Sequence, residues 1–236
     1  MNPQNLRHQR AVFFCHHQLN SMNKIIIIFG PPGSGKGTQA ARIIQKYGLN
    51  YFATGNLIRE ESEKETELGK KFKEILNDGR GRLVSDELVE QFIGEKLKNL
   101  DLAKGVIFDG YPRTINQANS LKNILGEIKP LVLILKVDTA AVIERILSRR
   151  ICENCEKVFE NPAKMGITKC DACGGKLVQR TDDNADTISK RIDIYENETA
   201  PLIDFYQKEG KIIEINGNLT IEEVWEEIQQ KLESDD

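Results

Sequence analysis

A glycine-rich segment that could bind phosphate follows an apolar run near the start of the chain. The run 24–29 is mostly isoleucine, and the segment Gly30–Thr38 has the sequence GPPGSGKGT. Glycines at 30, 33, 35 and 37 let the backbone adopt positive φ values, so that its amides can approach an anion closely. With Lys36 and the positive end of a helix that starts near it, these amides would form a phosphate cradle. The strand, the spacing, the lysine and the helix favour this interpretation over a turn that merely joins strand to helix.

The residue after the lysine departs from the usual pattern of such loops. In most phosphate-binding loops a serine or threonine follows the lysine directly and binds magnesium. Here Gly37 occupies that position, and the hydroxyl comes one place later, at Thr38. We therefore expect Mg²⁺ to be held largely through water and the substrate phosphates.

A second candidate segment, Phe108–Arg113, ends another apolar run. Ligands of open α/β sheets bind at the carboxyl ends of the strands, which is where this segment should lie. Asp109 there can orient hydrated magnesium, Gly110 permits close approach of the backbone, and Arg113 can bind a phosphate through two hydrogen bonds. The position favours this interpretation over a tight turn between a strand and a helix.

Four arginines outside these two segments are candidates to neutralise phosphate charge, which phosphoryl transfer requires together with alignment of the substrates and exclusion of water. Arg145 and Arg149 are four residues apart on an expected helix, so they should share one of its faces. Arg180 precedes the pair Asp182–Asp183, and Arg191 lies beside an apolar stripe of a later helix. A single arginine is more often solvated than catalytic, so the hypothesis that these four bind phosphate depends on the presence of the phosphate-binding loop.

Four cysteines form two CxxC pairs, Cys152 with Cys155 and Cys170 with Cys173, separated by 14 residues. Four thiolates at this spacing can surround one tetrahedral Zn²⁺ ion. Two disulfides or four unpaired thiols are the alternatives, and a structural metal explains two pairs in a short, core-poor segment better. Because four sulfur ligands leave no open position for water, the metal would stiffen the segment and take no part in catalysis.

These candidate residues need elements to position them, and the apolar runs predict a parallel sheet. Buried strands are expected at 24–29, 105–108, 131–137 and 211–215, with a weaker one at 49–52. Helices are expected at 36–47, 86–98, 114–126, 139–150, 184–207 and 220–232. The last helix begins with Thr220 and Glu223 at capping-box spacing. Continuous apolar strands that alternate with helices predict an α/β fold whose sheet is covered on both faces.

Two segments differ from this core in composition. Residues 53–82 are rich in charge, with oppositely charged pairs at helical spacing, which is typical of a small helical insertion. Residues 151–182 carry the clustered cysteines and have little helical signal. Both are expected to be appended lobes that can move as units. The expected division is an extension at 1–21, a core at 22–52, 83–147 and 184–236, an insertion at 53–82 and a lid at 148–183.

Length and composition are those expected of one soluble, intracellular α/β domain with insertions. The 236 residues can bury a sizeable core, and 33 basic against 36 acidic side chains give a net charge of −3. This balance argues against general binding to nucleic acid or to a membrane surface. No apolar stretch is long enough to span a membrane, and the cysteines do not suggest a secreted disulfide scaffold. We expect a cytoplasmic protein and, from its self-contained core, a monomer.

The first 21 residues differ from the rest, since they contain all three histidines and no acidic residue. Their apolar run at 11–15 is too short for a secretory signal. A transit peptide would be richer in arginine and serine, and a metal site at Cys15–His17 lacks partners at ligand spacing. We interpret the segment as a disordered or processed extension, because Met22 lies just before the first strand.

The motifs together resemble those of the adenylate kinases. The first loop matches their G-x-P-G-x-G-K-G-T form, and DGYPR at 109–113 followed by Gln117 resembles their D-G-[FY]-P-R…Q signature. The segment Thr54–Arg59 resembles their monophosphate-binding T-G…R, and Arg82–Glu87 resembles their L-V-x-D-E turn. The arginines and the four cysteines also match in order and spacing over residues 24–232. The resemblance implies a three-layer P-loop NTPase fold around a five-stranded parallel sheet, with a small insertion that binds nucleoside monophosphate and a zinc-bearing lid.

The resemblance also implies an activity and a role for each matching residue. The activity is reversible, Mg²⁺-dependent phosphoryl transfer from ATP to AMP to give two ADP, with small nucleotides rather than nucleic acid or membranes as partners. The residues implied for ATP are Gly33, Ser34, Gly35, Lys36, Gly37, Thr38, Arg145 and Arg149, with Arg180 also bracketing the donor. Those implied for AMP are Thr54, Arg59, Arg82, Leu83, Val84, Gly110, Arg113, Gln117, Arg180 and Arg191, with Gln117 reading the adenine edge. Those implied for catalysis are Lys36, Asp109, Arg113, Arg145, Arg149, Arg180 and Arg191.

Two positions depart from the family pattern, and four other functions compete with this one. Asn56 stands where many members have Asp, which should alter local helix capping but no proposed phosphate contact, and Ser85 replaces Pro or Thr as a helix N-cap. The nearest rivals are the same chemistry on UMP or CMP and a GTP:AMP phosphotransferase; Gln117 and the long lid argue against the pyrimidine kinases. A zinc-ribbon nucleic-acid module fused to an NTPase would need a basic, aromatic-rich face, whereas residues 151–182 contain Phe159 as their one aromatic. The intact set of arginines argues against a regulatory protein without catalysis.

Overall fold

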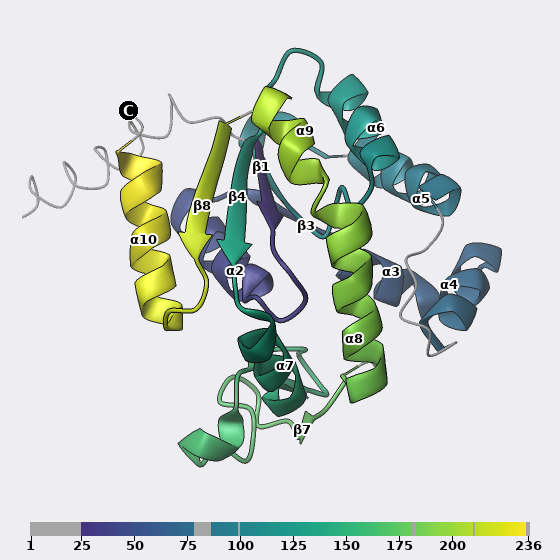
Figure 1. Ribbon diagram of the computed structural model, residues 1–236. Coiled ribbons are helices and arrows are strands. Elements are labelled where there is room, and N and C mark those ends of the chain that lie inside the picture. Colours follow the sequence, from purple (N-terminus) through teal and green to yellow (C-terminus); the bar gives the residue numbers. More distant parts are fainter. Residues whose placement is uncertain (1–24, 78–85, 99, 181–182, 210, 235–236) are drawn as a thin grey trace, which may run out of the picture.

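The computed structural model describes residues 25–77, 86–98, 100–180, 183–209 and 211–234, and a five-stranded sheet lies at its centre (Figure 1). The strands are β1 (Ile25–Phe29), β2 (Asn50–Ala53), β3 (Val106–Asp109), β4 (Leu131–Lys136) and β8 (Lys211–Asn216). They lie in the order β2-β3-β1-β4-β8, and each neighbouring pair is parallel. The expected strands are confirmed, including the weak one. Because all five run the same way, their carboxyl ends meet at one edge of the sheet.

Most helices lie where the periodicity predicts them. They are α2 (Lys36–Tyr47), α5 (Asp86–Lys98), α6 (Ile115–Leu125), α7 (Thr139–Ser148) and α10 (Ile221–Glu233), with a short 3₁₀ turn η2 (Leu102–Lys104) before β3. The capping box of α10 is confirmed: the Thr220 hydroxyl accepts from the Glu223 amide, and the Glu223 carboxylate accepts from the Thr220 amide at 2.9 Å.

The sheet is buried on both faces because its strand residues alternate between two apolar clusters. In β1, Ile25 and Ile27 pack into one cluster, while Ile26 and Ile28 pack into the other. Side chains of α5, α6 and α9 (Leu202–Glu209) fill the first cluster, and those of α2 and α10 fill the second. A run of four isoleucines is therefore the pattern that a doubly covered parallel strand requires, and each buried side chain contributes about 1.5–3 kcal/mol.

The single helix expected at 184–207 is wrong. The structure has α8 (Ala185–Ile194), a π-helical segment η4 (Tyr195–Thr199) and then α9. The Ala200 amide donates to the Tyr195 carbonyl at 2.8 Å, which is the five-residue spacing of a π-helix. Pro201 then has no amide hydrogen to donate, so a regular helix cannot run through this position.

The helix expected at 139–150 is also shorter than predicted. α7 ends at Ser148, and Arg149 has an extended backbone with φ −60° and ψ 141°. The expectation that Arg145 and Arg149 share a helix face is therefore wrong. The buried apolar face of α7 consists of Val142 and Ile146, whereas Ile143 and Leu147 are 37% and 41% exposed.

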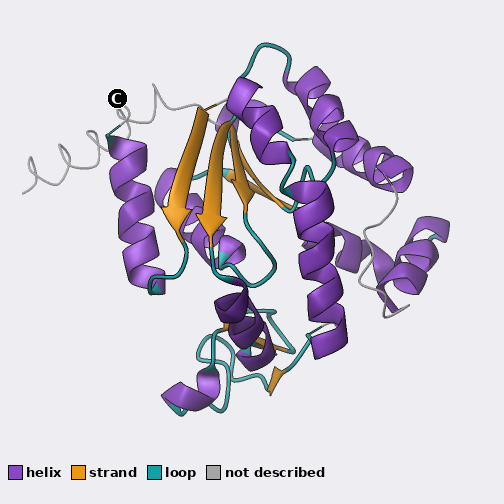
Figure 2. Cartoon of the chain, in the orientation of Figure 1, coloured by secondary structure: helices purple, strands orange, loops and turns teal. Residues whose placement is uncertain are grey.

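Two small groups of elements extend from the central sheet (Figure 2). In the first, α3 (Thr54–Ser62) and α4 (Glu67–Asn77) follow β2. In the second, β5 (Arg150–Cys152), β6 (Val158–Phe159) and β7 (Leu177–Val178) form an antiparallel sheet in the order β6-β5-β7, with a short helix η3 (Pro162–Met165). This second group lies beyond the carboxyl ends of the central strands, on the side toward which their arrowheads point (Figures 1 and 2).

Several predicted features lie outside the described ranges. They are the extension 1–21 with its Cys15–His17 segment, the residues Arg82, Leu83, Val84 and Ser85, and Asp182. Within the ranges that are described, no helix is both long enough and apolar enough to cross a membrane.

Candidate active site

The phosphate-binding loop joins β1 to α2 at the carboxyl edge of the sheet. Gly33 (φ 77°) and Gly35 (φ 88°) have the expected positive φ, and α2 begins at Lys36. A Cβ atom on Gly33 would lie 2.6 Å from Cγ1 of Ile146, so this close approach to α7 leaves no room for a side chain. The positive φ expected at Gly37 is wrong, because Gly37 is the second residue of α2 and is helical. The first amides of α2 have no acceptor within the helix and can bind an anion.

Lys36 folds back over this loop. Its ammonium donates to the carbonyls of Gly30 (2.7 Å) and Pro31 (2.8 Å). Removal from water lowers the pKa of Lys36 to about 8; the Asp109 carboxylate opposes this shift and the Arg113 guanidinium adds to it. The ammonium is therefore held in place by weak neutral acceptors, and a phosphate could exchange for them.

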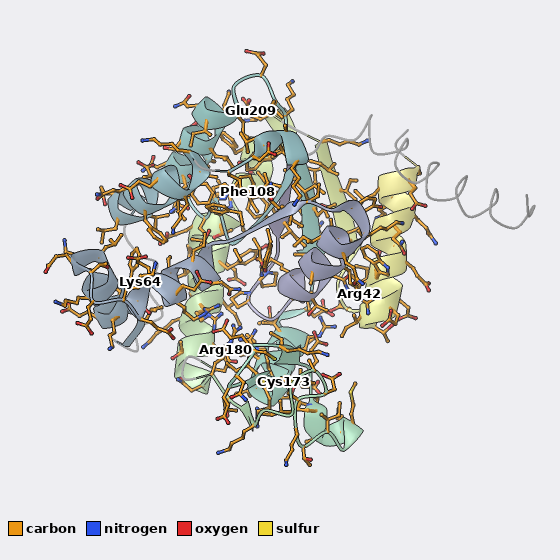
Figure 3. All side chains as sticks on the ribbon, turned by 180° about the vertical axis from the view of Figure 1, so that it is seen from behind. Arg42, Lys64, Phe108, Cys173, Arg180 and Glu209 are labelled. Atoms are coloured by element: carbon orange, nitrogen blue, oxygen red, sulfur yellow. The ribbon has the colours of Figure 1, made fainter. Side chains whose placement is uncertain are left out.

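A cavity of about 880 Å³ opens beside the loop and collects the predicted basic residues. The basic side chains that line it are Lys36, Arg59, Arg113, Arg145, Lys157, Arg149, Arg180 and Arg191. The other predicted site residues that line it are Gly33, Gly35, Gly37, Thr38, Thr54, Asp109, Gly110, Gln117 and Cys155. Ser34 does not line the cavity, because its side chain is buried beneath the loop. In Figure 3, Arg180 lies at the junction between the core and the cysteine-bearing lobe marked by Cys173.

Arg149 and Arg191 share the carboxylate of Asp183. Arg149 binds it with two hydrogen bonds, Nε to Oδ2 at 2.9 Å and Nη2 to Oδ1 at 2.5 Å. Arg191 Nη1 lies 3.4 Å from Oδ1, and the Asp183 side chain is fully buried. One buried carboxylate thus brings two guanidinium groups from α8 and the end of α7 together, which their mutual repulsion would otherwise oppose.

Arg145 is oriented by the turn after β8. Its Nη1 donates to the Gly217 carbonyl at 2.8 Å, and Nη2 lies 3.4 Å from the Leu219 carbonyl. The two contacts cross 72 and 74 positions of the chain. No pattern in the sequence pairs these residues, because backbone carbonyls carry no residue-specific signal.

Arg113 is held by the backbone around it. Its Nε donates to the Gly110 carbonyl at 3.0 Å, and Gly110 has φ 76°, a backbone conformation that favours glycine. The Arg113 amide donates to Oε1 of the buried Gln117 (2.9 Å), and the Thr199 hydroxyl donates to the Arg113 carbonyl (3.1 Å). Burial and the nearby Arg191 lower the pKa of Arg113, which still leaves the guanidinium protonated at neutral pH.

Thr54 and Arg59 lie on α3 and line the cavity. The Thr54 hydroxyl is buried and has no hydrogen-bond partner among the residues that the structure describes. Such a group in a cavity wall can be satisfied by a ligand. Arg59 Nη2 donates to the Asn56 side-chain oxygen at 2.5 Å. Asn56 thus contacts a candidate phosphate-binding arginine, in addition to any part in helix capping.

The four clustered cysteines come together at one point. Their sulfur atoms all lie within 4.8 Å of one another, with Cys152 and Cys173 at 3.4 Å and Cys155 and Cys170 at 3.6 Å. These distances exclude disulfides as the structure stands, and four sulfurs around a tetrahedral Zn²⁺ would lie about 3.8 Å apart. The donor set therefore fits a zinc ion, and Cys155 connects this cluster to the wall of the main cavity.

Sequence reasoning missed three groups at the site. Tyr51 donates through its hydroxyl to Asp109 Oδ2 at 2.9 Å, Thr199 reaches Arg113, and Asp183 pairs the two arginines. Two of them carried a sequence signal: Tyr51 lies near the carboxyl end of a predicted strand, and Asp183 belongs to the acidic pair that follows Arg180, although its partners Arg149 and Arg191 were not predicted. The contacts of Thr199 and Asp183 depend on how α8 and η4 pack against the core.

The phosphate-binding loop at the carboxyl edge of a parallel sheet and the arginine-lined cavity beside it define a P-loop protein with a site for phosphorylated nucleotides. A family model described as adenylate kinase matches residues 28–211. The chain belongs to the adenylate kinase family. It is similar to adenylate kinases of Archaeoglobus fulgidus (44% identical, covering 88% of this chain and 97% of the relative), Kosmotoga olearia (44%; 89% and 99%) and Alkaliphilus oremlandii (41%; 89% and 99%).

Proposed function

We propose that this protein transfers the γ-phosphoryl group of ATP reversibly to AMP, giving two ADP, and so maintains the balance of adenine nucleotides. The observation that carries the proposal is the gathering of Lys36 and six arginines around one cavity that also contains the orphaned hydroxyl of Thr54. Membership of the adenylate kinase family supports the same reaction. Positive charge on several sides suits two anionic substrates whose transferring phosphoryl group develops further charge.

On the donor side, the loop Gly33–Thr38 and Lys36 would hold the ATP phosphates, and Arg145 and Arg149 would flank them. Asp109 faces the cavity close to Gly37, so its carboxylate fits a role in orienting hydrated Mg²⁺. When bound, Mg²⁺ neutralises charge on the donor phosphates. Arg180 would bracket the donor together with Arg145, and Arg149 and Arg191 would stabilise the transferring phosphoryl group.

On the acceptor side, Thr54, Arg59, Gly110 and Arg113 would bind AMP. Gln117 would read the adenine edge, since the hydrogen bond from the Arg113 amide to Oε1 holds its carboxamide at the cavity. Arg82, Leu83 and Val84 complete the proposed set by resemblance. The acceptor phosphate is already an anion, so no general base is required.

The proposed lobes are the monophosphate-binding insertion 53–82 and the lid 148–183, around a core of 22–52, 83–147 and 184–236. Closure of both over the substrates would expel water and protect ATP from hydrolysis. We propose that Zn²⁺ fills the cysteine cluster and stiffens the lid. Its thiols fit a reducing compartment such as the cytoplasm, and the self-contained core fits a monomer.

The test is nucleotide turnover by zinc-loaded protein with Mg-ATP and, separately, AMP, UMP, CMP or GMP. Formation of ADP at a high rate only with AMP is the expected result. Faster transfer to UMP or CMP would overturn the assignment of the acceptor, and equal rates with GTP as the donor would overturn that of ATP. Absence of transfer to any acceptor would refute the catalytic function itself.

A further inference from the structure

Gly37 provides no side chain at the position that directly follows the lysine of the phosphate-binding loop. Most such loops place a serine or threonine directly after the lysine, and its hydroxyl binds magnesium. A Cβ atom built on Gly37 would meet two oxygen atoms: Asp109 Oδ2 at 3.5 Å and the Tyr51 hydroxyl at 3.8 Å. The space that the missing hydroxyl side chain would enter is therefore bordered by a carboxylate and a phenol from two neighbouring strands.

Sheet register brings these two oxygens together. In the β2–β3 pair, Ala53 is opposite Asp109 and Tyr51 is opposite Ile107. Tyr51 and Ala53 are two residues apart, so the Tyr51 side chain projects from the same face as Asp109 and reaches it diagonally. The hydroxyl donates to Asp109 Oδ2 at 2.9 Å.

The phenol of Tyr51 has no evident packing role that would explain this arrangement. The side chain is 41% exposed and lines the main cavity, while its strand neighbour Phe52 is buried in the core. Removal from water and the neighbouring Asp109 carboxylate raise the pKa of Tyr51, so the hydroxyl remains protonated and acts as a donor. An exposed aromatic ring whose polar end contacts one carboxylate fits a role in orienting that carboxylate.

We propose that Tyr51 is a positioning residue that holds the Asp109 carboxylate beside Gly37, where other phosphate-binding loops present a metal-binding hydroxyl. The inference rests on the proposed function, in which Asp109 orients hydrated Mg²⁺. Without the hydrogen bond, the Asp109 carboxylate could rotate toward Lys36, whose charge attracts it. Tyr51 thus acts on the bound metal and the donor phosphates through Asp109, without contacting the transferring phosphoryl group.

The test compares nucleotide binding with and without magnesium. Calorimetry measures the affinity of wild type and Tyr51→Phe for a non-hydrolysable ATP analogue, once with excess Mg²⁺ and once with a chelator present. We expect Tyr51→Phe to weaken the magnesium-dependent affinity about three- to tenfold and to leave the metal-free affinity unchanged. Equal weakening in both conditions, or no weakening in either, would overturn the proposal.

Two further variants separate positioning from general damage. Tyr206→Phe removes the hydroxyl of a buried tyrosine on α9, away from the cavity, and should leave both affinities unchanged. In an Asp109→Ala background, Tyr51→Phe should cause no additional loss, because the acceptor of its hydrogen bond is already gone. An additional loss of similar size there would show that Tyr51 acts independently of Asp109. Phosphoryl transfer by wild type is measured separately, so that its absence refutes the proposed function and not this inference alone.

Discussion

At the scale of single residues, the site consists of charged side chains that are held in place by the hydrogen bonds they donate to backbone carbonyls or to one buried carboxylate. Lys36 donates to two carbonyls of its own loop, Arg113 donates to the Gly110 carbonyl, and Arg145 donates to the Gly217 carbonyl. Neutral acceptors leave the charges of these side chains uncompensated. The lining of the cavity is therefore positively charged, and anionic nucleotides can neutralise this charge.

The lowered pKa of Lys36 predicts a pH-dependent affinity. Bound phosphates would raise this pKa again, so the complex holds more protons than the free protein above pH about 8. Affinity for Mg-ATP should consequently fall as the pH rises through about 8 and beyond, with proton uptake on binding. Calorimetry in buffers of different ionisation enthalpy measures that uptake.

A matched variant tests the origin of this proton. Lys36→Met should abolish the uptake and lower kcat by about 10²–10³-fold, because a preorganised charge is removed from the phosphates. Proton uptake that persists in Lys36→Met would assign the titration to another group.

Asp183 is predicted to matter for both stability and catalysis. Asp183→Asn removes the negative charge that holds Arg149 and Arg191 together, and both guanidinium groups are partly buried. We expect the free energy of unfolding to fall by about 1–3 kcal/mol and kcat to fall at least tenfold. Denaturant unfolding and steady-state kinetics measure the two effects.

The control for this variant is Asp193→Asn on the same helix, where the side chain is exposed. It should change the free energy of unfolding by less than about 0.5 kcal/mol. If both variants lose the same stability, the loss reflects α8 in general and not the buried pair.

At the scale of elements, the central sheet and the lid are stabilised by different physics. The sheet buries long isoleucine and leucine runs on both faces, whereas the buried apolar cluster of the lid consists of Cys152, Phe159 and Cys170. So few side chains cannot offset the conformational entropy of ordering the lid. Four thiolates on one metal ion can supply the missing free energy.

Removal of the metal should therefore unfold the lid and spare the core. We expect about one zinc atom per chain by atomic absorption. Chelation should lower kcat more than tenfold, because Arg149 and Arg180 flank the lid, while the far-ultraviolet circular dichroism of the helices changes little. A chelated protein with unchanged kcat would contradict the structural role of the metal, and Ser substitution of Cys155 should reproduce the effect of chelation.

At the scale of the whole molecule, the candidate residues come from three parts of the chain that meet around the cavity. The core supplies Lys36, Asp109 and Arg113, α3 supplies Thr54 and Arg59, and the junction with the lid supplies Arg149 and Arg180. Charges of one sign on separate parts repel one another when no ligand is present. Two anionic nucleotides would bridge them, so binding and closure should be linked.

This linkage predicts a change in size. The radius of gyration measured by X-ray scattering should decrease when a non-hydrolysable Mg-ATP analogue and AMP are both added, and decrease less with either alone. Arg59→Ala should remove the share that AMP contributes. Identical scattering with and without nucleotides would contradict closure of the lobes.

Local patterns in the sequence predicted a large part of the fold and of the chemical groups at the site. The apolar runs predicted the three inner strands β1, β3 and β4 most clearly, because a strand buried on both faces must be continuously apolar, and the partly exposed edge strands β2 and β8 also lie where they were predicted. The loop at Gly30–Thr38 and the two CxxC pairs predicted a phosphate site and a metal site, since both chemistries depend on residues close together in the chain. Caps such as Thr220 with Glu223 are equally local, and that prediction is confirmed.

Only the tertiary structure decided how the charges are arranged. The break at Tyr195–Thr199, just before Pro201, and the early end of α7 contradicted the helices expected from periodicity alone. The pairing of Asp183 with two arginines and that of Tyr51 with Asp109 join residues that are distant in the chain. Such contacts arise from sheet register and helix packing, which no local pattern of residues encodes. Sequence therefore determined which chemical groups are present, and the fold determined which of them meet.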